Sequence, residues 1–290
     1  MSPIAKGRPE KPPDPADDLD RETYHKITKF VYDHARITLG ENKMELIRAR
    51  LGKIIRQKNM SGYRAYYKWM SEDKTGEAVR EVMNAVATNL TAFFRENKHF
   101  DYLANQLLPS FARSGERRLR AWSAGCSTGQ EVYTIAMTIL ENLPQADSQY
   151  DIKLLATDID TDVVRTGATG IYSQDAVKGI PDALLRRYFQ PGATDQRGRP
   201  GWKVGEELRR LVSFRFLNLF SQWPFRGRFD FIFCRNVMIY FDRPTQEQLL
   251  NRYWEQLRPG GTLFIGHSES LNGINHQYEY VLPTIYRRPK

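Results

Sequence analysis

Residues 119–131 read Leu-Arg-Ala-Trp-Ser-Ala-Gly-Cys-Ser-Thr-Gly-Gln-Glu. The first six of these residues are mostly apolar, which is typical of a short buried strand. Small residues at 125–129 then predict a turn. From about Gln130 onward apolar residues recur at helical spacing, and they are Val132, Ile135, Ala136, Ile139 and Leu140. A strand, a glycine turn and a helix N-terminus in this order form the opening of a nucleotide-binding α/β unit.

The turn differs from a phosphate-binding loop. It lacks the G-x-G-x-x-G spacing, and the carboxylate of Glu131 near the start of the helix would repel a pyrophosphate. A carboxylate at this point suits a ligand that carries a cation or ribose hydroxyls. Taken alone, the stretch is equally compatible with a tight strand–helix turn in an ordinary core, so the rest of the chain has to decide.

The composition limits the number of domains and the class of protein. A chain of 290 residues with 41% hydrophobic content has room for one large domain and a smaller one, each with a core. No run approaches the roughly 18 apolar residues of a membrane span, and the first residues lack the apolar segment of a secretory signal. The two cysteines, Cys126 and Cys234, have no metal-ligand spacing, as expected for buried free thiols. We therefore expect a cytoplasmic protein without membrane insertion.

The N-terminal third divides into a tail and a helical region. Residues 1–19 are rich in Pro, Asp and Lys, which predicts a disordered tail. Residues 20–90 show helical patterns without a strand and predict a small helical domain. Asp20 is a candidate N-cap for the first helix, and further helices are expected at about 43–58, 62–70 and 75–87.

The helix expected at 43–58 is strongly basic. Between residues 43 and 68 the chain has eight Lys and Arg against one acid, Glu45. Charged residues opposite an apolar stripe are commonly only a solvated face, but such a face tends to mix both signs. The imbalance predicts an acidic partner, and nucleic acid, an anionic membrane surface and an acidic protein all fit. The candidate partner-binding residues are Arg48, Arg50, Lys53 and Arg56.

Residues 91–290 alternate between predicted strands and helices. Strands are expected at 119–124, 152–157, 212–217, 229–234, 262–266 and within 278–287. Helices are expected at 130–140, 180–189 and 245–257, and one over 100–108 should stop at Pro109. This alternation is typical of a doubly wound, mostly parallel α/β sheet covered on both faces. The Gly- and Pro-rich stretch 190–210 predicts a small β subdomain insertion.

Polar side chains lie at or just beyond the ends of several predicted strands. They are Glu131, Asp158, Asn218 and Asn236. Because ligands of open α/β sheets bind at the carboxyl ends of the strands, this coincidence predicts a ligand site. Asp158 could accept hydrogen bonds from both hydroxyls of an adenosine ribose. Alternatively it could cap the following helix, a task for which Asp160 is equally suited.

The polar residues at the predicted strand ends do not form a recognisable catalytic motif. No Ser-His-Asp set, metal cluster or phosphate-binding loop is visible, and we assign none of the five scattered histidines as a metal ligand. His267 follows a predicted strand and could line the site. A polar rim without a base or nucleophile suits a reaction in which the cofactor carries the activation, such as methyl transfer from a sulfonium.

Five stretches closely resemble the chemotaxis receptor methyltransferases, the CheR family. They are 88–96, 123–131, 156–160, 231–241 and 266–269, in family order, within a likeness that covers about 22–287. The resemblance implies a Rossmann-like methyltransferase sheet and a protein-glutamate O-methyltransferase that uses S-adenosyl-L-methionine and releases S-adenosyl-L-homocysteine. Its expected substrates are glutamates on the acidic cytoplasmic helices of methyl-accepting chemoreceptors.

The resemblance also implies roles for single residues. Those expected to contact the cofactor are Asn89, Thr91, Arg95, Gly125, Glu131, Asp158, Asn218, Leu219, Arg235 and Asn236. Arg95 and Tyr240 would position the substrate carboxylate and the methyl group. The basic helix would dock on the receptor, and the enzyme is expected to be a monomer. A substrate glutamate with an ordinary pKa of about 4.3 is already ionised at neutral pH and needs no general base.

The sequence departs from the family pattern at two places, and two other functions are compatible with parts of it. Many family members have Gly-Glu-Glu where this chain has Gly129-Gln130-Glu131. The insertion at 190–210 is less like the form that recognises a receptor C-terminal pentapeptide, which leaves binding of such a pentapeptide open. A nucleic-acid methyltransferase would suit the basic helix, but the Asn/Asp-Pro-Pro-Tyr/Phe run of amino-directed enzymes is missing after the fourth strand. A catalytically idle, cofactor-binding adaptor is the other alternative, and the presence of Arg95, Asp158 and Tyr240 argues against it.

Overall fold

The computed structural model describes residues 19–143, 145–195 and 198–290. It consists of two compact units: the first contains residues 19–34 together with Leu39–Val86, and the second contains Ala35–Thr38 and Ala87–Lys290. The tail predicted at 1–19 lies outside the described residues except for Leu19, which is buried.

The first unit is all-helical, as predicted. It contains α1 (Arg21–Ala35), the 3₁₀ turn η2 (Glu41–Lys43), α2 (Met44–Gln57), α3 (Tyr63–Glu72) and α4 (Glu77–Val86). The carboxylate of Asp20 accepts a hydrogen bond from the Thr23 amide at 2.7 Å, which confirms Asp20 as the N-cap of α1. One face of each helix supplies the core, as Ile47, Leu51 and Ile55 do for α2.

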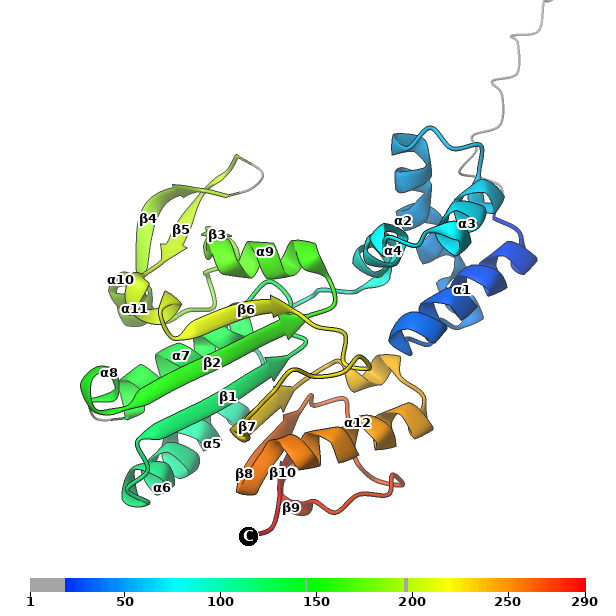
Figure 1. Cartoon of the computed structure of the whole chain (residues 1–290). Coiled ribbons are helices and arrows are strands. Elements are labelled where there is room, and N and C mark those ends of the chain that lie inside the picture. Colours follow the sequence, from blue (N-terminus) through cyan, green and yellow to red (C-terminus); the bar gives the residue numbers. More distant parts are fainter. Residues whose placement is uncertain (1–18, 144, 196–197) are drawn as a thin grey trace, which may run out of the picture. The chain divides into compact units, whose positions relative to one another are not determined.

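The second unit is built on a seven-stranded sheet (Figure 1). Its strands are β1 (Arg118–Ala124), β2 (Asp151–Asp158), β6 (Val212–Phe216), β7 (Phe229–Cys234), β8 (Leu257–Ile265), β9 (Glu279–Leu282) and β10 (Ile285–Arg287). They are ordered β6-β2-β1-β7-β8-β10-β9, the first five parallel and the last two antiparallel. The predicted doubly wound, mostly parallel sheet is confirmed, and the strand order reverses between β1 and β7, where such sheets bind ligands.

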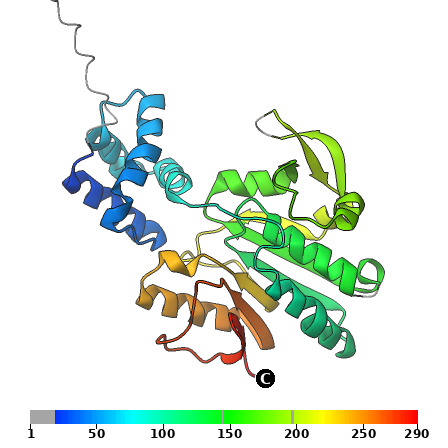
Figure 2. The same cartoon turned by 180° about the vertical axis from the view of Figure 1, so that it is seen from behind.

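Helices lie on both faces of this sheet. One face packs against α5 (Lys98–Tyr102), α6 (Leu108–Arg113), α7 (Gln130–Asn142) and α9 (Thr161–Thr169), most of which are seen in Figure 2. The other face packs against α12 (Arg243–Gln256), whose Leu249, Leu250 and Tyr253 bury Trp122 and Ile232. The short helix α8 (Ala146–Gln149) precedes β2. Among the helices of the described ranges, none has both the length and the apolar character of a membrane span.

The predicted helix stop at Pro109 is wrong. The chain stays helical from Lys98 to Arg113, because a π turn, η3 (Leu103–Leu107), lies between α5 and α6. The Leu108 amide donates to the carbonyl of Leu103, five residues back, which starts a new helical register. Pro109 then occupies the first turn of α6, where a missing backbone N–H is tolerated.

The predicted β insertion is confirmed, with a wider extent than 190–210. Three antiparallel strands form it in the order β3-β5-β4: β3 (Ile171–Ser173), β5 (Pro200–Val204) and β4 (Phe189–Thr194). It therefore begins at Ile171 and includes α10 (Asp182–Tyr188), while Glu206–Arg209 form the short helix α11. Residues 196–197 of the insertion lie outside the described residues.

Candidate functional site

The turn after β1 needs its glycines. Gly125 and Gly129 have φ of 90° and 95°, in the left-handed region that side chains disfavour. A Cβ added at Gly125 would stand 2.3 Å from Cγ2 of Val237, which follows β7. The amides of Gly125 and Cys126 donate to the carbonyl of Thr157 on β2. The turn is thus fixed against β2 and β7, at the point where the strand order reverses.

Asp158, at the end of β2, is a buried carboxylate that accepts few hydrogen bonds from the protein. Its Oδ2 accepts from the Ser127 amide at 2.8 Å and its Oδ1 from the Asp160 amide at 3.0 Å. Each carboxylate oxygen can accept a further hydrogen bond. Burial raises the pKa of Asp158 to about 6, and these amides lower it only in part. A raised pKa of this kind is common at ligand sites.

The neighbouring Asp160 resolves the alternative left open by the sequence. Asp160 is the N-cap of α9, since its Oδ1 accepts from the amides of Asp162 at 2.8 Å and Val163 at 3.3 Å. Its other oxygen accepts from Asn89 Nδ2 at 2.6 Å. The Asn89 carbonyl in turn accepts from the Ser127 hydroxyl at 2.9 Å. Helix capping therefore belongs to Asp160, and the segment at Asn89 is bound to the glycine turn.

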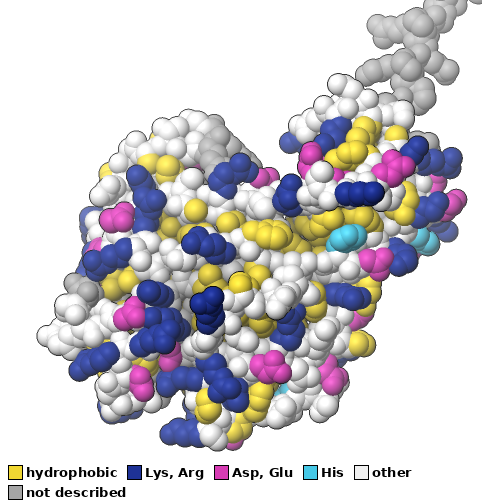
Figure 3. Space-filling view, in the orientation of Figure 1, with side chains coloured by type: hydrophobic (Ala, Val, Ile, Leu, Met, Phe, Trp, Pro, Cys, Tyr) yellow, Lys and Arg dark blue, Asp and Glu magenta, His cyan; other side chains and the backbone are white. Residues whose placement is uncertain are grey.

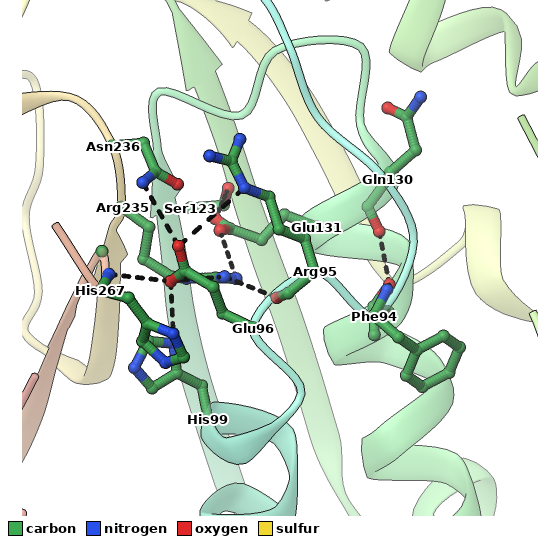
Figure 4. A network of polar contacts seen from close by, with 12 residues as sticks. Phe94, Arg95, Glu96, His99, Ser123, Gln130, Glu131, Arg235, Asn236 and His267 are labelled. Carbon is green, nitrogen blue, oxygen red and sulfur yellow. Dashed lines mark hydrogen bonds and ion pairs between the residues drawn. The ribbon is translucent and has the colours of Figure 1, made fainter. Parts of the chain in front are cut away.

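A second group of predicted residues meets around Arg235, which directly follows β7 (Figure 4). The Arg235 side chain is 2% exposed and donates to Glu96 Oε2 at 2.9 Å, to Glu131 Oε2 at 3.1 Å and to the Arg95 carbonyl at 2.5 Å. The other oxygen of Glu131 accepts from the Ser123 hydroxyl at 2.7 Å. Burial raises the pKa of Glu131 against the opposing charge of Arg235. Both Glu131 oxygens are thus engaged within the protein, and a cofactor contact of Glu131 remains a prediction.

Glu96 is the centre of this network and was missed in the sequence. Besides Arg235 it accepts from the His267 amide at 3.1 Å and from Asn236 Nδ2 at 3.3 Å. Burial, the largest single influence on its pKa, raises it, but the charge and hydrogen bonds of Arg235 outweigh burial and the pKa is lowered. Glu96 thereby joins the segment before α5 to the ends of β7 and β8.

The backbone around Arg95 is strained. Phe94 and Glu96 have φ of 56° and 58°, in the left-handed region that non-glycine residues rarely adopt. Strained backbone of this kind persists only where surrounding contacts determine it. The Glu96–Arg235 ion pair is such a contact. It holds Arg95, whose guanidinium donates to the Leu90 carbonyl at 2.6 Å, in one arrangement.

Glu269 joins two loops at the strand ends, as Glu96 does. Its role was not predicted from the sequence either. Its carboxylate accepts from the amides of Asn236 and Val237 at 3.0 Å, of Ile239 at 3.2 Å and of Gly266 at 2.5 Å. It thus joins the loop after β7 to the loop after β8. Burial raises the pKa of Glu269 despite these amides. A signal for it existed, because Glu269 lies in one of the stretches that carry the family resemblance.

Two histidines lie beside Glu96. One potential ligand atom each of Glu96, His99 and His267 lie within 4.8 Å of one another. Thr284 donates its hydroxyl to the Pro283 carbonyl and accepts from His99 Nε2, so Nδ1 of His99 carries the lone pair. The Glu96 oxygen nearest to it, at 3.8 Å, already binds Arg235. A divalent cation there would face that guanidinium, so the arrangement favours a polar network over a metal centre.

The other predicted residues lie along the same edge of the sheet. The Leu217 amide donates to the Asp158 carbonyl at 3.0 Å, which places Asn218 and Leu219 directly after the contact between β6 and β2. Tyr240 ends the 3₁₀ turn η4 (Met238–Tyr240) after β7. Thr91 lies half-buried in the strained segment before α5.

A doubly wound sheet with a glycine turn after β1 and an acid ending β2 fits a nucleoside-containing ligand, and the comparisons define the class as an S-adenosylmethionine-dependent methyltransferase. Residues 22–87 match the model "CheR methyltransferase, all-alpha domain", and residues 89–286 match "CheR methyltransferase, SAM binding domain". The chain therefore belongs to the CheR methyltransferase family, as its resemblance predicted.

Chemotaxis methyltransferases of several bacteria are similar to this chain over almost their whole length. The chain is 41% identical to a probable chemotaxis protein methyltransferase of Rhizobium etli, over 89% of this chain and 96% of the relative. It is 39% identical to chemotaxis protein methyltransferase 2 of Pseudomonas aeruginosa, over 92% of each. It is 37% identical to the chemotaxis protein methyltransferase of Escherichia coli, over 92% of this chain and 91% of the relative.

Proposed function

We propose that this methyltransferase forms methyl esters on glutamate side chains of chemoreceptor cytoplasmic domains, and so serves sensory adaptation. The names of the relatives support the pathway. The observation that carries the chemistry is the presence of two groups at one edge of the sheet: Asp158, whose carboxylate oxygens can accept further hydrogen bonds, and the cation Arg95, on a strained turn held by Arg235. The enzyme is proposed to act in the cytoplasm as a monomer.

The site fits S-adenosyl-L-methionine, which supplies a methyl group on a positively charged sulfur. Asp158 would accept from the ribose hydroxyls with the capacity that Ser127 and Asp160 leave free. The missing side chain of Gly125 lets the turn pack closely against Val237, which keeps the turn at the strand ends where the cofactor would bind. The family resemblance adds the remaining cofactor contacts, which are Asn89, Thr91, Arg95, Glu131, Asn218, Leu219, Arg235 and Asn236.

The protein's task in catalysis is alignment. A glutamate substrate is its own nucleophile at neutral pH, because its ordinary pKa is about 4.3. Arg95 would hold that carboxylate by a charge-assisted hydrogen bond, and Tyr240 would help to orient it. Excluding water around Arg95 and the substrate carboxylate would strengthen the hydrogen bond between them and so hold the carboxylate in line with the methyl group. Glu131 adds little repulsion to an incoming carboxylate, since Arg235 compensates its charge.

The helical unit is proposed to bind the acidic receptor helices through α2. Lys53 and Arg56 are exposed, and Arg48 is one-third exposed. Arg50 differs, because its guanidinium donates to the carbonyls of Ala85 and Val86 at 3.1 and 3.0 Å, at the end of α4. Arg50 therefore has a structural task within the unit. Its role in docking is proposed together with that of the other three cations.

The test is transfer of a labelled methyl group to a purified receptor cytoplasmic fragment, with mild-base release of methanol as the readout. Base-labile label on glutamate is the expected result. Arg95→Ala should reduce transfer about 100-fold while cofactor affinity changes far less, and Arg113→Ala, on an exposed position of α6, is the control. Label on nucleic acid, or cofactor binding without any turnover, would replace the proposal with one of the two alternatives.

A further inference from the structure

One face of the sheet lacks its helix over β2 and β6. Parallel sheets are ordinarily covered on both faces. Here α12 and the loop side chains Trp223 and Phe225 cover this face over β1, β7 and β8. No helix of this unit, among the residues that the structure describes, lies in front of β2 and β6 (Figure 1). The connection from β6 to β7, residues 217–228, is a loop where a crossover helix would be expected.

The strand register identifies which side chains this open face carries. Leu119 on β1 and its partner Ile152 on β2 are buried on the helix-covered side. Because side chains alternate along a strand, Arg118 and Lys153 point to the open side, and so does Arg215 on β6. All three are exposed.

The β6–β7 loop adds two more cations. Arg118 Nη2 lies 3.8 Å from the position that a Cβ on Gly227 would take, so the side chain of Arg118 reaches the loop. Arg226 and Arg228, on either side of Gly227, are exposed. We call these five cations the open basic face: Arg118, Lys153, Arg215, Arg226 and Arg228. Figure 3, in the orientation of Figure 1, shows Lys and Arg side chains gathered over this region.

Acidic compensation on this face is slight. Asp151, exposed at the start of β2, lies opposite Arg118 in register and pairs with Arg120. It is also near Lys153, so this one carboxylate faces three cations. An ordinary solvated surface mixes both signs, whereas a one-sign field attracts a partner of opposite charge. The shape adds a second constraint, because the face of a parallel sheet is the surface on which helices pack.

We infer that the open basic face is a docking surface for an acidic α-helix of the methyl-accepting substrate. This inference rests on the proposed function and names a surface for the substrate separate from α2. Position supports it, since Arg215 pairs in register with Thr157, the residue before Asp158. A helix lying along β2 and β6 would therefore end at the edge of the sheet that holds the candidate site.

The experiment compares two double charge reversals, Lys153→Glu with Arg215→Glu, and Arg113→Glu with Arg186→Glu on exposed positions of α6 and α10. Substrate is a receptor cytoplasmic fragment at saturating cofactor. The first variant should raise KM for the fragment about tenfold at about 50 mM salt, with kcat and cofactor affinity unchanged, and the difference should shrink at about 500 mM salt. The second should leave KM within about twofold of the unmodified enzyme.

A direct binding measurement separates this inference from the proposed function. Fluorescence anisotropy with labelled receptor fragment reports docking even if no methyl group is transferred, so absent methylation with face-dependent binding would overturn only the proposed function. Equal KM and equal binding for the two variants would overturn the docking surface. So would a loss confined to single-stranded RNA or to phosphatidylglycerol vesicles. If the first variant fails to fold, Arg226→Ala with Arg228→Ala, in the loop, tests the same face.

Discussion

Glu96, whose side chain is 11% exposed, and the buried Asp158 are two carboxylates at the same edge of one sheet, and their surroundings are opposite. Glu96 pairs with the guanidinium of Arg235 and accepts two further hydrogen bonds, and its pKa is lowered. Asp158 has two backbone amides as donors, and burial raises its pKa to about 6. A carboxylate with saturated acceptors holds a structure together, whereas one with acceptors to spare lowers stability until a ligand completes it.

The largest effect should come from removing the saturated carboxylate. Glu96→Ala leaves the buried Arg235 with Glu131 as its remaining acidic partner and releases the strained turn at Phe94. We expect a loss of about 3 kcal/mol in the free energy of unfolding, measured by denaturant titration of tryptophan fluorescence. Methyl transfer should fall as well, because Arg95 loses its bracing.

The control is Asp175→Ala, which removes an exposed carboxylate paired with Lys178 at 2.7 Å in the same unit. A fully exposed pair of this kind contributes little to stability, because water and salt screen it. Equal losses for Glu96→Ala and Asp175→Ala would break the comparison, since the buried network would then have no special weight.

The second effect should be on binding and not on stability. Asp158→Asn keeps the shape of the side chain but removes the charge that the ribose hydroxyls would meet. We expect cofactor affinity to fall about 100-fold by calorimetry, the worth of two charge-assisted hydrogen bonds, with stability unchanged or slightly raised.

The neighbouring carboxylate provides the matched control for this prediction. Asp160→Asn keeps an oxygen that can cap α9, and Asn caps helices about as well as Asp, so stability should change by less than about 0.5 kcal/mol and affinity much less than in Asp158→Asn. If Asp160→Asn lowered the affinity more than Asp158→Asn, the assignment of the two acids would be reversed.

The third effect concerns pH. A proton competes with the ribose for Asp158 as the pH falls through its pKa of about 6, so affinity should be full above that pH and about tenfold weaker at pH 5. The stability contribution has the opposite sign: burying the carboxylate destabilises the folded state above pH 6, and the cost is relieved as the pH falls below 6 toward the ordinary value. Calorimetry between pH 5 and 8 measures the first effect. A pH dependence that persists in Asp158→Asn would assign it to another group.

The sequence predicted the position of Asp158 at the end of its strand, but it did not predict the network around Glu96. The strand at 119–124, its glycine turn and the acid ending the next strand follow from local patterns that the structure confirms. Asp158, which has acceptor capacity left, could be predicted as a site residue because a polar residue directly after a buried strand is easy to recognise in the sequence. Glu96, like Glu269, lies in a stretch that carries the family resemblance, but its role in the network could not be predicted, since its partners Arg235 and His267 are 139 and 171 residues away in the chain. Long-range pairing leaves no periodic signal.

The two local errors have a similar origin. Pro109 is a helix breaker in an α register, and nothing in the sequence announces the π turn that shifts this register. The β insertion began earlier than predicted because β3 is three residues long, and its pairing with β5 joins Ile171 to Lys203. In both places the deciding hydrogen bond, and not the residue type, fixes the structure.

The smallest expected effect extends the comparison from carboxylates to cations. In the helical unit Arg50 has its donors engaged by the carbonyls of Ala85 and Val86, whereas Lys53, one turn further along α2, is exposed. By the same reasoning Arg50→Ala should cost about 1 kcal/mol of stability, as for a lost helix-end hydrogen bond, and Lys53→Ala less than 0.5 kcal/mol. Binding of a receptor fragment, measured by anisotropy at low salt, should respond more to Lys53→Ala. If Arg50→Ala instead leaves stability unchanged and weakens binding more, engagement of donors within the fold does not distinguish structural from docking cations here.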